Sequence, residues 1–408
     1  MKKTLVKLIA RFIGHKCITF DGSRIYYWKV PMMVIPMEIL VNLQHNLEKE
    51  FGSDTRKLFY YLGKIQGRNG SNILIERFRI IPDESDLSFF MEQSEFVGIG
   101  KINLEKNEVS KGYMLLDNIN STNAKAYLDA YGKRNKPICD YVRGLISGAV
   151  EAIFQAASKT DETLDGVEIN CHAKGDLSCR IEVKRTNLWM DTEFKDELSF
   201  NFSELEEVKK KQTLSMLLRS AAKNIDKPET QLSLSFKKKY KGNHIEYKEG
   251  GVVSLLGMDC LITPVDMTIW LYRILFKKYG DKVNDVFYET GLTFGKKSTE
   301  YLFNEFDLKK NNISNIKMAF EMPGLFGLGH VTVLKLDMNN HNYLIRVGNS
   351  SAIQYKELFG LSKIKMDYFL AGIFSGILEY IFDLKFDVKE DVCAVSGAKY
   401  CIFKGIKK

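Results

Sequence analysis

The chain has 408 residues, of which 45% are hydrophobic and 12% aromatic, and this is enough for two domains that each bury a core. Its 59 lysines and arginines outnumber its 51 acidic residues only slightly. A nucleic-acid-binding protein usually carries a more concentrated basic excess, so we expect no nucleic-acid partner. Seven cysteines, an odd number in a long chain, favour a reducing, cytoplasmic environment over a disulfide framework.

Residues 1–21 form a basic N-terminal segment. If this segment is helical, its apolar side chains fall on one stripe, and its lysines and arginines mostly flank that stripe. Lys7 and Arg11 interrupt the apolar core that a secretory signal would need. Two interpretations stay open: the helix docks on the body of the protein, or it contacts a membrane surface.

One stretch of the sequence occurs twice. Residues 36–70 align without a gap with residues 264–298, an offset of 228, and nine of the 35 aligned pairs are identical. Most of the identical residues are glycine, proline or aromatic, and their recurrence at fixed spacing indicates one backbone used twice. We therefore expect two similar domains, at 22–186 and 246–408, joined by a linker at 187–245.

Each repeat has the same predicted order of elements. A proline, Pro36 or Pro264, opens an amphipathic helix that ends at a glycine, Gly52 or Gly280. A second helix, a β-rich stretch, a helix with glycines at i and i+4 and a terminal hairpin follow. This mixture of helices and antiparallel hairpins predicts the α+β class. In the linker, a capping box at residues 203–206 predicts a helix that packs across the two repeats.

Cysteines and carboxylates recur at matched positions near the end of each repeat. The spacing Glu-x2-Cys-x7-Cys occurs twice, and a Cys or Asp precedes the glycine-containing helix each time. Sets of four thiolate and carboxylate ligands suit tetrahedral zinc and leave no open position for catalysis. The alternative is a group of buried structural thiols. The candidate ligands are Cys139, Glu168, Cys171 and Cys179 in the first repeat and Asp367, Glu390, Cys393 and Cys401 in the second.

One geometric condition applies to the glutamates. On a regular strand, residues three apart, such as Glu168 and Cys171, face opposite sides of the sheet. A bulge or bend must therefore separate them if both are to bind one ion. Because the second set has two thiolates instead of three, it should bind zinc more weakly. We expect one structural zinc ion in the first repeat and a second, weaker site in the other.

The same segments resemble the C-terminal half of the 4-vinyl reductase domain family. The resemblance is carried by NKPICDYVRGLISGAVEAIF with GVEINCHAKGDLSCRIEV, and by MDYFLAGIFSGILEYIF with VKEDVCAVSGAKYCIFKG. It covers nearly all of both repeats. This family includes ligand-sensing domains of phenol- and xylene-responsive bacterial activators, predicted hydrocarbon-binding proteins and a protein linked to bacteriochlorophyll synthesis. Its fold is similar to that of TRAPP vesicle-tethering subunits.

The resemblance implies two tandem TRAPP-subunit-like domains, each an antiparallel sheet with helices, arranged as a pseudo-dimer. It also implies that zinc on Cys139, Glu168, Cys171 and Cys179 lies beside an enclosed pocket for an aromatic ligand. Asp367 departs from the family's ligand pattern. An apolar pocket lined by helices is the usual place for such a ligand. The aromatic residues that we expect around it are Phe59, Tyr60, Trp270, Phe287 and Tyr288.

Three functions are compatible with these features. The first, which we favour, is a non-catalytic protein that binds or senses a small apolar or aromatic molecule and signals through a protein partner. The second is an enzyme or accessory factor in the reduction of a vinyl-bearing tetrapyrrole. The sequence shows no nucleotide or flavin signature for the hydride chemistry that this enzyme would need. The third is an adaptor, similar to TRAPP subunits, that binds other proteins.

Overall fold

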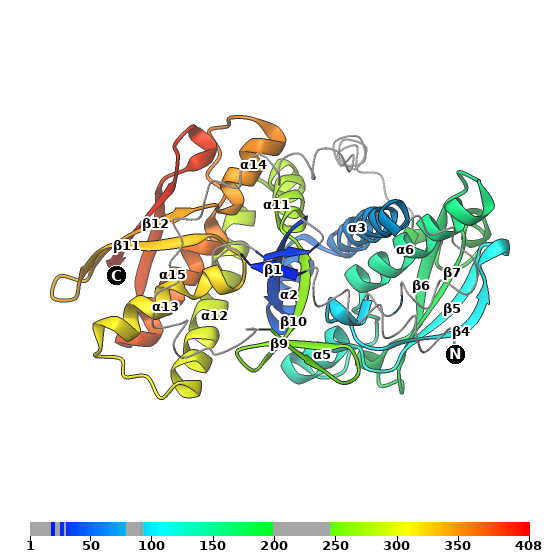
Figure 1. Cartoon of the computed structure of the whole chain (residues 1–408), viewed down its shortest axis with the longest axis horizontal. Coiled ribbons are helices and arrows are strands. Elements are labelled where there is room, and N and C mark those ends of the chain that lie inside the picture. Colours follow the sequence, from blue (N-terminus) through cyan, green and yellow to red (C-terminus); the bar gives the residue numbers. More distant parts are fainter. Residues whose placement is uncertain (1–17, 21–24, 28–29, 79–90, 92–93, 199–244) are drawn as a thin grey trace.

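The computed structural model describes residues 18–20, 25–27, 30–78, 91, 94–198 and 245–408. They form two lobes on either side of a shared central sheet (Figure 1). Each lobe ends in a four-stranded antiparallel sheet, and a pair of long helices lies between that sheet and the centre of the molecule. The architecture is α+β, as the sequence predicts.

The elements of the two repeats follow the same order, apart from insertions. The first repeat contains β1 (Ile18–Phe20), β2 (Ile25–Tyr27), β3 (Val30–Pro36), α2 (Met37–Phe51), α3 (Asp54–Phe78), β4 (Ile102–Glu108), η1 (Val109–Lys111), β5 (Tyr113–Asn118), α5 (Thr122–Tyr131), α6 (Asp140–Ser158), β6 (Leu164–Asn170), η2 (His172–Lys174), β7 (Cys179–Arg185), η3 (Thr186–Trp189) and α7 (Lys195–Leu198). The second contains β8 (Ile245–Lys248), β9 (Val252–Leu255), β10 (Met258–Pro264), α11 (Asp266–Tyr279), α12 (Lys282–Glu305), α13 (Ile313–Leu325), β11 (His330–Asp337), β12 (Asn342–Gly348), α14 (Ser351–Phe359), α15 (Tyr368–Phe382), β13 (Phe386–Val392), η4 (Ala394–Ser396) and β14 (Cys401–Lys407).

The central sheet joins the two repeats. Its strand order is β1-β2-β3-β10-β9-β8, so each repeat contributes three strands and β3 pairs with β10 in the middle. This pairing is antiparallel, and Val34 lies opposite Ile262, which is its own equivalent at the 228-residue offset. Equivalent residues face each other when a local twofold axis passes between them. The repeats therefore form a pseudo-dimer, as the sequence predicts.

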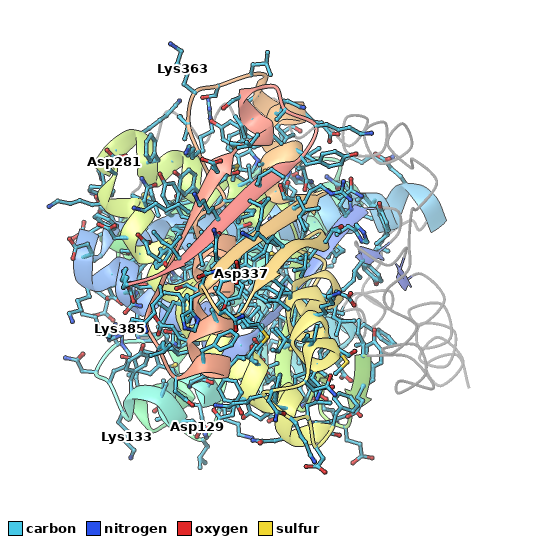
Figure 2. The ribbon with its side chains drawn as sticks, turned by 90° about the vertical axis from the view of Figure 1, so that its left-hand side faces the viewer. Asp129, Lys133, Asp281, Asp337, Lys363 and Lys385 are labelled. Atoms are coloured by element: carbon cyan, nitrogen blue, oxygen red, sulfur yellow. The ribbon has the colours of Figure 1, made fainter. Side chains whose placement is uncertain are left out.

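The two outer sheets have the same topology. Their strand orders are β4-β5-β7-β6 and β11-β12-β14-β13. Figure 2 views the molecule from the end of the second repeat, where the strands lie in front of the helices and charged residues such as Asp337 and Lys385 lie at the surface. The inner face of each sheet packs on the helix pair, so the core of each lobe lies between them.

Glycines allow the long helices of each lobe to touch through their backbones. In the first lobe, a Cβ atom at Gly144 would lie 2.0 Å from the carbonyl oxygen of Tyr60, and one at Gly148 would lie 1.9 Å from that of Lys64. The helices α12 and α15 repeat this contact, because a Cβ at Gly372 would lie 2.0 Å from the carbonyl oxygen of Tyr288. Only glycine permits so close an approach. The glycine spacing in the sequence thus identifies the two helices that pack together in each lobe.

Two predicted helices lie outside the described residues: the amphipathic helix of residues 1–17 and the linker helix that begins at 203. Residues 18–20, at the end of the predicted N-terminal segment, form β1 and pair with β2. The helix α13, which contains Pro323, is not predicted from the sequence. Among the described residues, no helix combines the length and the apolar character needed to cross a membrane.

We predict that Gly148→Ala destabilises the protein by about 3 kcal/mol, the upper end of the usual cost of overpacking, because the new methyl group must push α3 and α6 apart. Gly70→Ala is the matched control: it lies on α3, and its Cβ would meet nothing within 4 Å. The control should stabilise the helix slightly. Urea unfolding measures both changes, and an equal effect of the two substitutions would contradict the backbone contact.

Candidate functional site

A buried cluster of three thiols and one carboxylate lies where α6 meets the outer hairpin of the first lobe. Cys139 immediately precedes α6, Glu168 lies on β6, and Cys171 and Cys179 lie on either side of the turn between β6 and β7. All four are buried, and their ligand atoms lie within 4.8 Å of one another. The structure thus brings together the four residues that the sequence selects for the first repeat.

A β-bulge makes this arrangement possible. The pairing of β6 with β7 shifts register between Glu168 and Asn170, so the strand does not alternate regularly before it reaches Cys171. The pairing of β13 with β14 shifts at the equivalent place, between Glu390 and Val392. The bulge supplies the bend that the geometric condition requires, because one extra residue returns the following side chain to the same side.

The distances and the donor set fit a bound metal ion. The Sγ atoms of Cys139 and Cys179 are 3.8 Å apart, and a tetrahedral site with metal–sulfur bonds of about 2.3 Å has an edge of about 3.8 Å. Burial, followed by the neighbouring Cys171, raises the pKa of Glu168 well above its usual value. Glu168 Oε1 is buried and has no hydrogen-bond partner among the described residues. A cation among the four donors would satisfy this orphaned oxygen.

Nearby donors hold the other atoms of the cluster in place. The backbone N–H of Cys139 donates to Glu168 Oε2 at 3.2 Å, and the backbone N–H of His172 donates to Cys179 Sγ at 3.3 Å. The hydroxyl of Ser121 lies 3.4 Å from Cys139 Sγ. N–H groups directed at sulfur and carboxylate oxygen stabilise the ionised forms that bind metals.

The second repeat forms a similar but less complete cluster. The ligand atoms of Glu390, Cys393 and Cys401 lie within 4.8 Å of one another. Asp367 Oδ2 lies 3.4 Å from Cys401 Sγ, and its Oδ1 accepts a hydrogen bond from Ser351. Burial, followed by the nearby Asp367, raises the pKa of Glu390 to about 10. These donors could also hold a metal ion, with Asp367 where the first repeat has a thiol.

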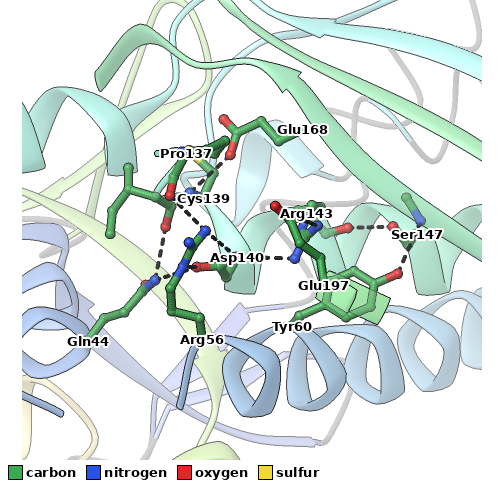
Figure 3. A network of polar contacts seen from close by, with 12 residues as sticks. Gln44, Arg56, Tyr60, Pro137, Cys139, Asp140, Arg143, Ser147, Glu168 and Glu197 are labelled. Atoms are coloured by element: carbon green, nitrogen blue, oxygen red, sulfur yellow. Dashed lines mark hydrogen bonds and ion pairs between the residues drawn. The ribbon is translucent and has the colours of Figure 1, made fainter. Parts of the chain in front are cut away.

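A buried ionic network fixes the start of α6 beside the first cluster (Figure 3). Asp140 accepts hydrogen bonds from Gln44 and Arg56, both at 2.8 Å, and it pairs with Arg143 at 3.2 Å. Arg143 also pairs with Glu197 at 3.1 Å. Because Asp140 follows Cys139 directly in the chain, this network also positions the cysteine.

An apolar cavity of about 160 Å³ lies on the side of α6 opposite to this ionic network. Apolar residues of α3, α6, β3 and β10 form most of its wall, and polar side chains interrupt this wall at a few places. A mostly apolar cavity with a few polar groups is the usual form of a small-molecule site. Its lining includes Val30, Met32, Ile73, Leu74, Ile99, Ile102, Leu145, Ile146 and Ile262, together with the polar Gln66, Ser71, Ser94, Tyr141 and Thr263.

Phenylalanine side chains fill the corresponding part of the second repeat. Phe294 and Phe369, at the positions equivalent to Gln66 and Tyr141, have ring centroids 6.0 Å apart, and Phe294 packs edge-on against Phe326 at 4.9 Å. A cavity of about 30 Å³ lies nearby. The two repeats therefore share a backbone, but they differ in the space that their cores leave.

A further cavity of about 330 Å³ lies between the repeats. Charged side chains line much of it, including Asp129, Asp259 and the ion-paired Glu38 and Lys297. It lacks the largely apolar wall that favours a buried organic ligand.

The structure places the five aromatic residues that the sequence suggested for ligand contact in both lobes, one of them at a cavity. Phe59, Tyr60 and Trp270 are fully buried in the cores, and the Tyr60 hydroxyl donates to Asp165. Phe287 lines the 30 Å³ cavity, and the Tyr288 hydroxyl accepts a hydrogen bond from the backbone of β13. None of them lines the 160 Å³ cavity.

No family model and no curated protein sequence gives a significant match to the chain. Solved structures give partial matches. The phenol-responsive sensory domain of the transcription activator PoxR with phenol is 18% identical, with 47% of this chain and 96% of that chain covered and a TM-score of 0.38. A vinyl-4-reductase family protein from Methanocaldococcus jannaschii is 24% identical, with coverages of 35% and 88% and a TM-score of 0.24.

A trafficking protein particle complex subunit 3 from Naegleria fowleri, covalently bound to palmitic acid, is 15% identical. This match covers 35% of this chain and 92% of that chain, with a TM-score of 0.27. Because all three TM-scores are below 0.5, membership of the 4-vinyl reductase domain family stays a prediction.

We predict that Asp140→Asn destabilises the protein by about 3 kcal/mol, because it leaves the buried Arg56 without its counter-charge and Arg143 with Glu197 alone. Asp54→Asn is the control, since Asp54 forms an exposed pair with Lys278 and should cost less than about 1 kcal/mol. Guanidinium unfolding of both variants measures the difference. Equal losses would show that the network around Asp140 has no special role.

Proposed function

We propose that the chain is a non-catalytic protein that binds a small, mostly apolar molecule in the cavity of the first repeat. The observation that carries this proposal is a cavity of about 160 Å³ between α3, α6 and β10. An apolar cavity of about 150 Å³ in another protein stays dry and binds benzene. The ligand is therefore about the size of one ring with a short substituent, and the bound state is passed to a protein partner.

The size of this cavity argues against the alternative of a tetrapyrrole enzyme. A tetrapyrrole macrocycle contains four linked rings, and a cavity of about 160 Å³ holds a molecule of roughly one ring. Binding of a compact molecule is the function that the geometry supports best.

The metal of the first cluster is zinc in this proposal, with a structural role. Three thiolates and one carboxylate form a closed tetrahedral set, which suits Zn²⁺ and leaves no position for a substrate. The residues that would hold it are Cys139, Glu168, Cys171 and Cys179. Asp367, Glu390, Cys393 and Cys401 would hold a second ion more weakly, because two of its four donors are carboxylates.

Helix α6 links the metal cluster to the ligand cavity. Cys139 precedes the first residue of α6, and Tyr141, Leu145 and Ile146 of the same helix line the cavity. A metal ion that ties Cys139 to the hairpin β6–β7 would therefore fix one wall of the cavity. Loss of the ion should weaken both ligand binding and stability, since metal binding and folding are coupled.

We predict that the protein purified without chelator contains about one or two zinc ions per chain. Cys179→Ser should remove the ion of the first cluster, and it should lower stability more than Cys401→Ser, which affects only the weaker second cluster. Elemental analysis by mass spectrometry measures the content. A value near zero in the wild-type protein would end the metal proposal without affecting the existence of the cavity.

We predict that the wild-type protein binds ethylbenzene and that Ile146→Phe weakens this binding at least tenfold, because the larger ring occupies the cavity. Phe374 is the equivalent residue of the second repeat, so Phe374→Ile is the matched control and should leave binding in the first repeat unchanged. Isothermal titration calorimetry gives both affinities. Equal binding by wild type and Ile146→Phe would place the ligand outside this cavity.

A further inference from the structure

Three polar side chains meet at one end of the cavity, and they come from both repeats. The Tyr141 hydroxyl donates to Gln66 Oε1, and it lies 2.5 Å from the Thr263 hydroxyl. Tyr141 and Gln66 belong to α6 and α3 of the first repeat, whereas Thr263 lies on β10 of the second. All three line the cavity. We call these three residues the polar cluster.

The fold itself does not require polar residues at these places. At the 228-residue offset, Gln66, Tyr141 and Thr263 correspond to Phe294, Phe369 and Ile35. Phe294 and Ile35 are buried, Phe369 is partly buried, and the two phenylalanines pack together. The same backbone therefore carries apolar residues at these positions in the second repeat, where the core is filled, and polar residues in the first repeat, where the core contains a cavity. The polar residues and the open space occur together, which points to a ligand.

The polar cluster retains hydrogen-bonding capacity toward the cavity. Within the described part of the chain, Gln66 uses one of its two N–H groups, which donates to Asp266 Oδ1 at 3.2 Å. Because the Tyr141 O–H donates to Gln66, the Thr263 O–H donates within the cluster, to Tyr141 or to Gln66 Oε1 at 3.4 Å. The Thr263 oxygen can still accept a hydrogen bond. Burial raises the pKa of Tyr141, so its hydroxyl stays protonated and keeps its hydrogen bond to Gln66. A neutral ligand group that both donates and accepts would complete these bonds.

We propose that the polar cluster recognises one neutral hydroxyl-type group on an otherwise apolar ligand, and that Thr263 makes this contact from the second repeat. The inference rests on the proposed function and names the chemical class of its ligand. A charged group does not fit, because the cavity is largely apolar and a buried charge would lack a compensating partner. The second repeat, whose equivalent region is filled by phenylalanine side chains, thereby contributes a residue to the ligand site of the first repeat.

The test uses two probes of equal size, benzyl alcohol and ethylbenzene, which differ by a hydroxyl in place of a methyl group. Thr263→Val keeps the shape of the side chain and removes its hydroxyl, and Tyr141→Phe installs the residue that the second repeat has. Each variant should weaken benzyl alcohol binding about five- to tenfold, the usual effect of losing one hydrogen bond in a binding site. Ethylbenzene binding should change less than twofold.

Ile35→Val is the matched control, because Ile35 is the twofold equivalent of Thr263 and lines only the 30 Å³ cavity of the second repeat. It should change neither affinity. Calorimetric titration of the full chain, with circular dichroism to confirm folding, gives all the values. If both probes bind the wild type and every variant shifts them equally, the polar cluster is structural and the inference fails. If neither probe binds the wild type, the proposed function itself fails.

Discussion

The contact between the backbones of α3 and α6 is the constraint on which the rest of the first lobe depends. The two helices meet at four glycines. A Cβ atom added at any of them would lie within 2.2 Å of a carbonyl oxygen of the other helix; they are Gly63, Gly67, Gly144 and Gly148. This contact fixes how α6 lies on α3 along its length. It therefore sets where Cys139 meets the outer hairpin and where Tyr141 meets α3 at the cavity. The cluster of cysteines and Glu168 and the cavity therefore share helix α6.

The duplication gives each repeat this helix pair. The local twofold axis passes between Val34 and Ile262, so strands of both repeats meet at the centre of the molecule. Divergence at a few positions then separates their roles. The first lobe keeps an open space and buried polar groups, whereas the second fills the space with Phe294, Phe326 and Phe369. A closely packed core is stable, whereas a core with an apolar cavity can bind a ligand. The second repeat can therefore stabilise the central sheet, whose strands β3 and β10 also line the cavity of the first repeat.

The sequence predicts the parts of this arrangement that are local or repeated. Glycine spacing marks the helix pairs, and the doubled Glu-x2-Cys-x7-Cys pattern marks both clusters, because each depends on residues close in the chain. The bulge after Glu168 depends on strand pairing, which spacing alone does not reveal. The residues that line the cavity were not predicted, because they come from distant parts of the chain and Thr263 reaches the cavity from the other repeat. A position-by-position comparison of the repeats was the signal that indicates these residues, because Gln66 aligns with Phe294 and Tyr141 aligns with Phe369.

A crystal structure of the chain under xenon pressure tests the central claim most directly, because xenon enters apolar cavities without needing a specific ligand. The account predicts a xenon atom among α3, α6 and β10, beside Leu145 and Ile262, and none at the equivalent place beside Phe294. Xenon in the second repeat alone, or in neither repeat, would contradict the assignment of the binding site to the first.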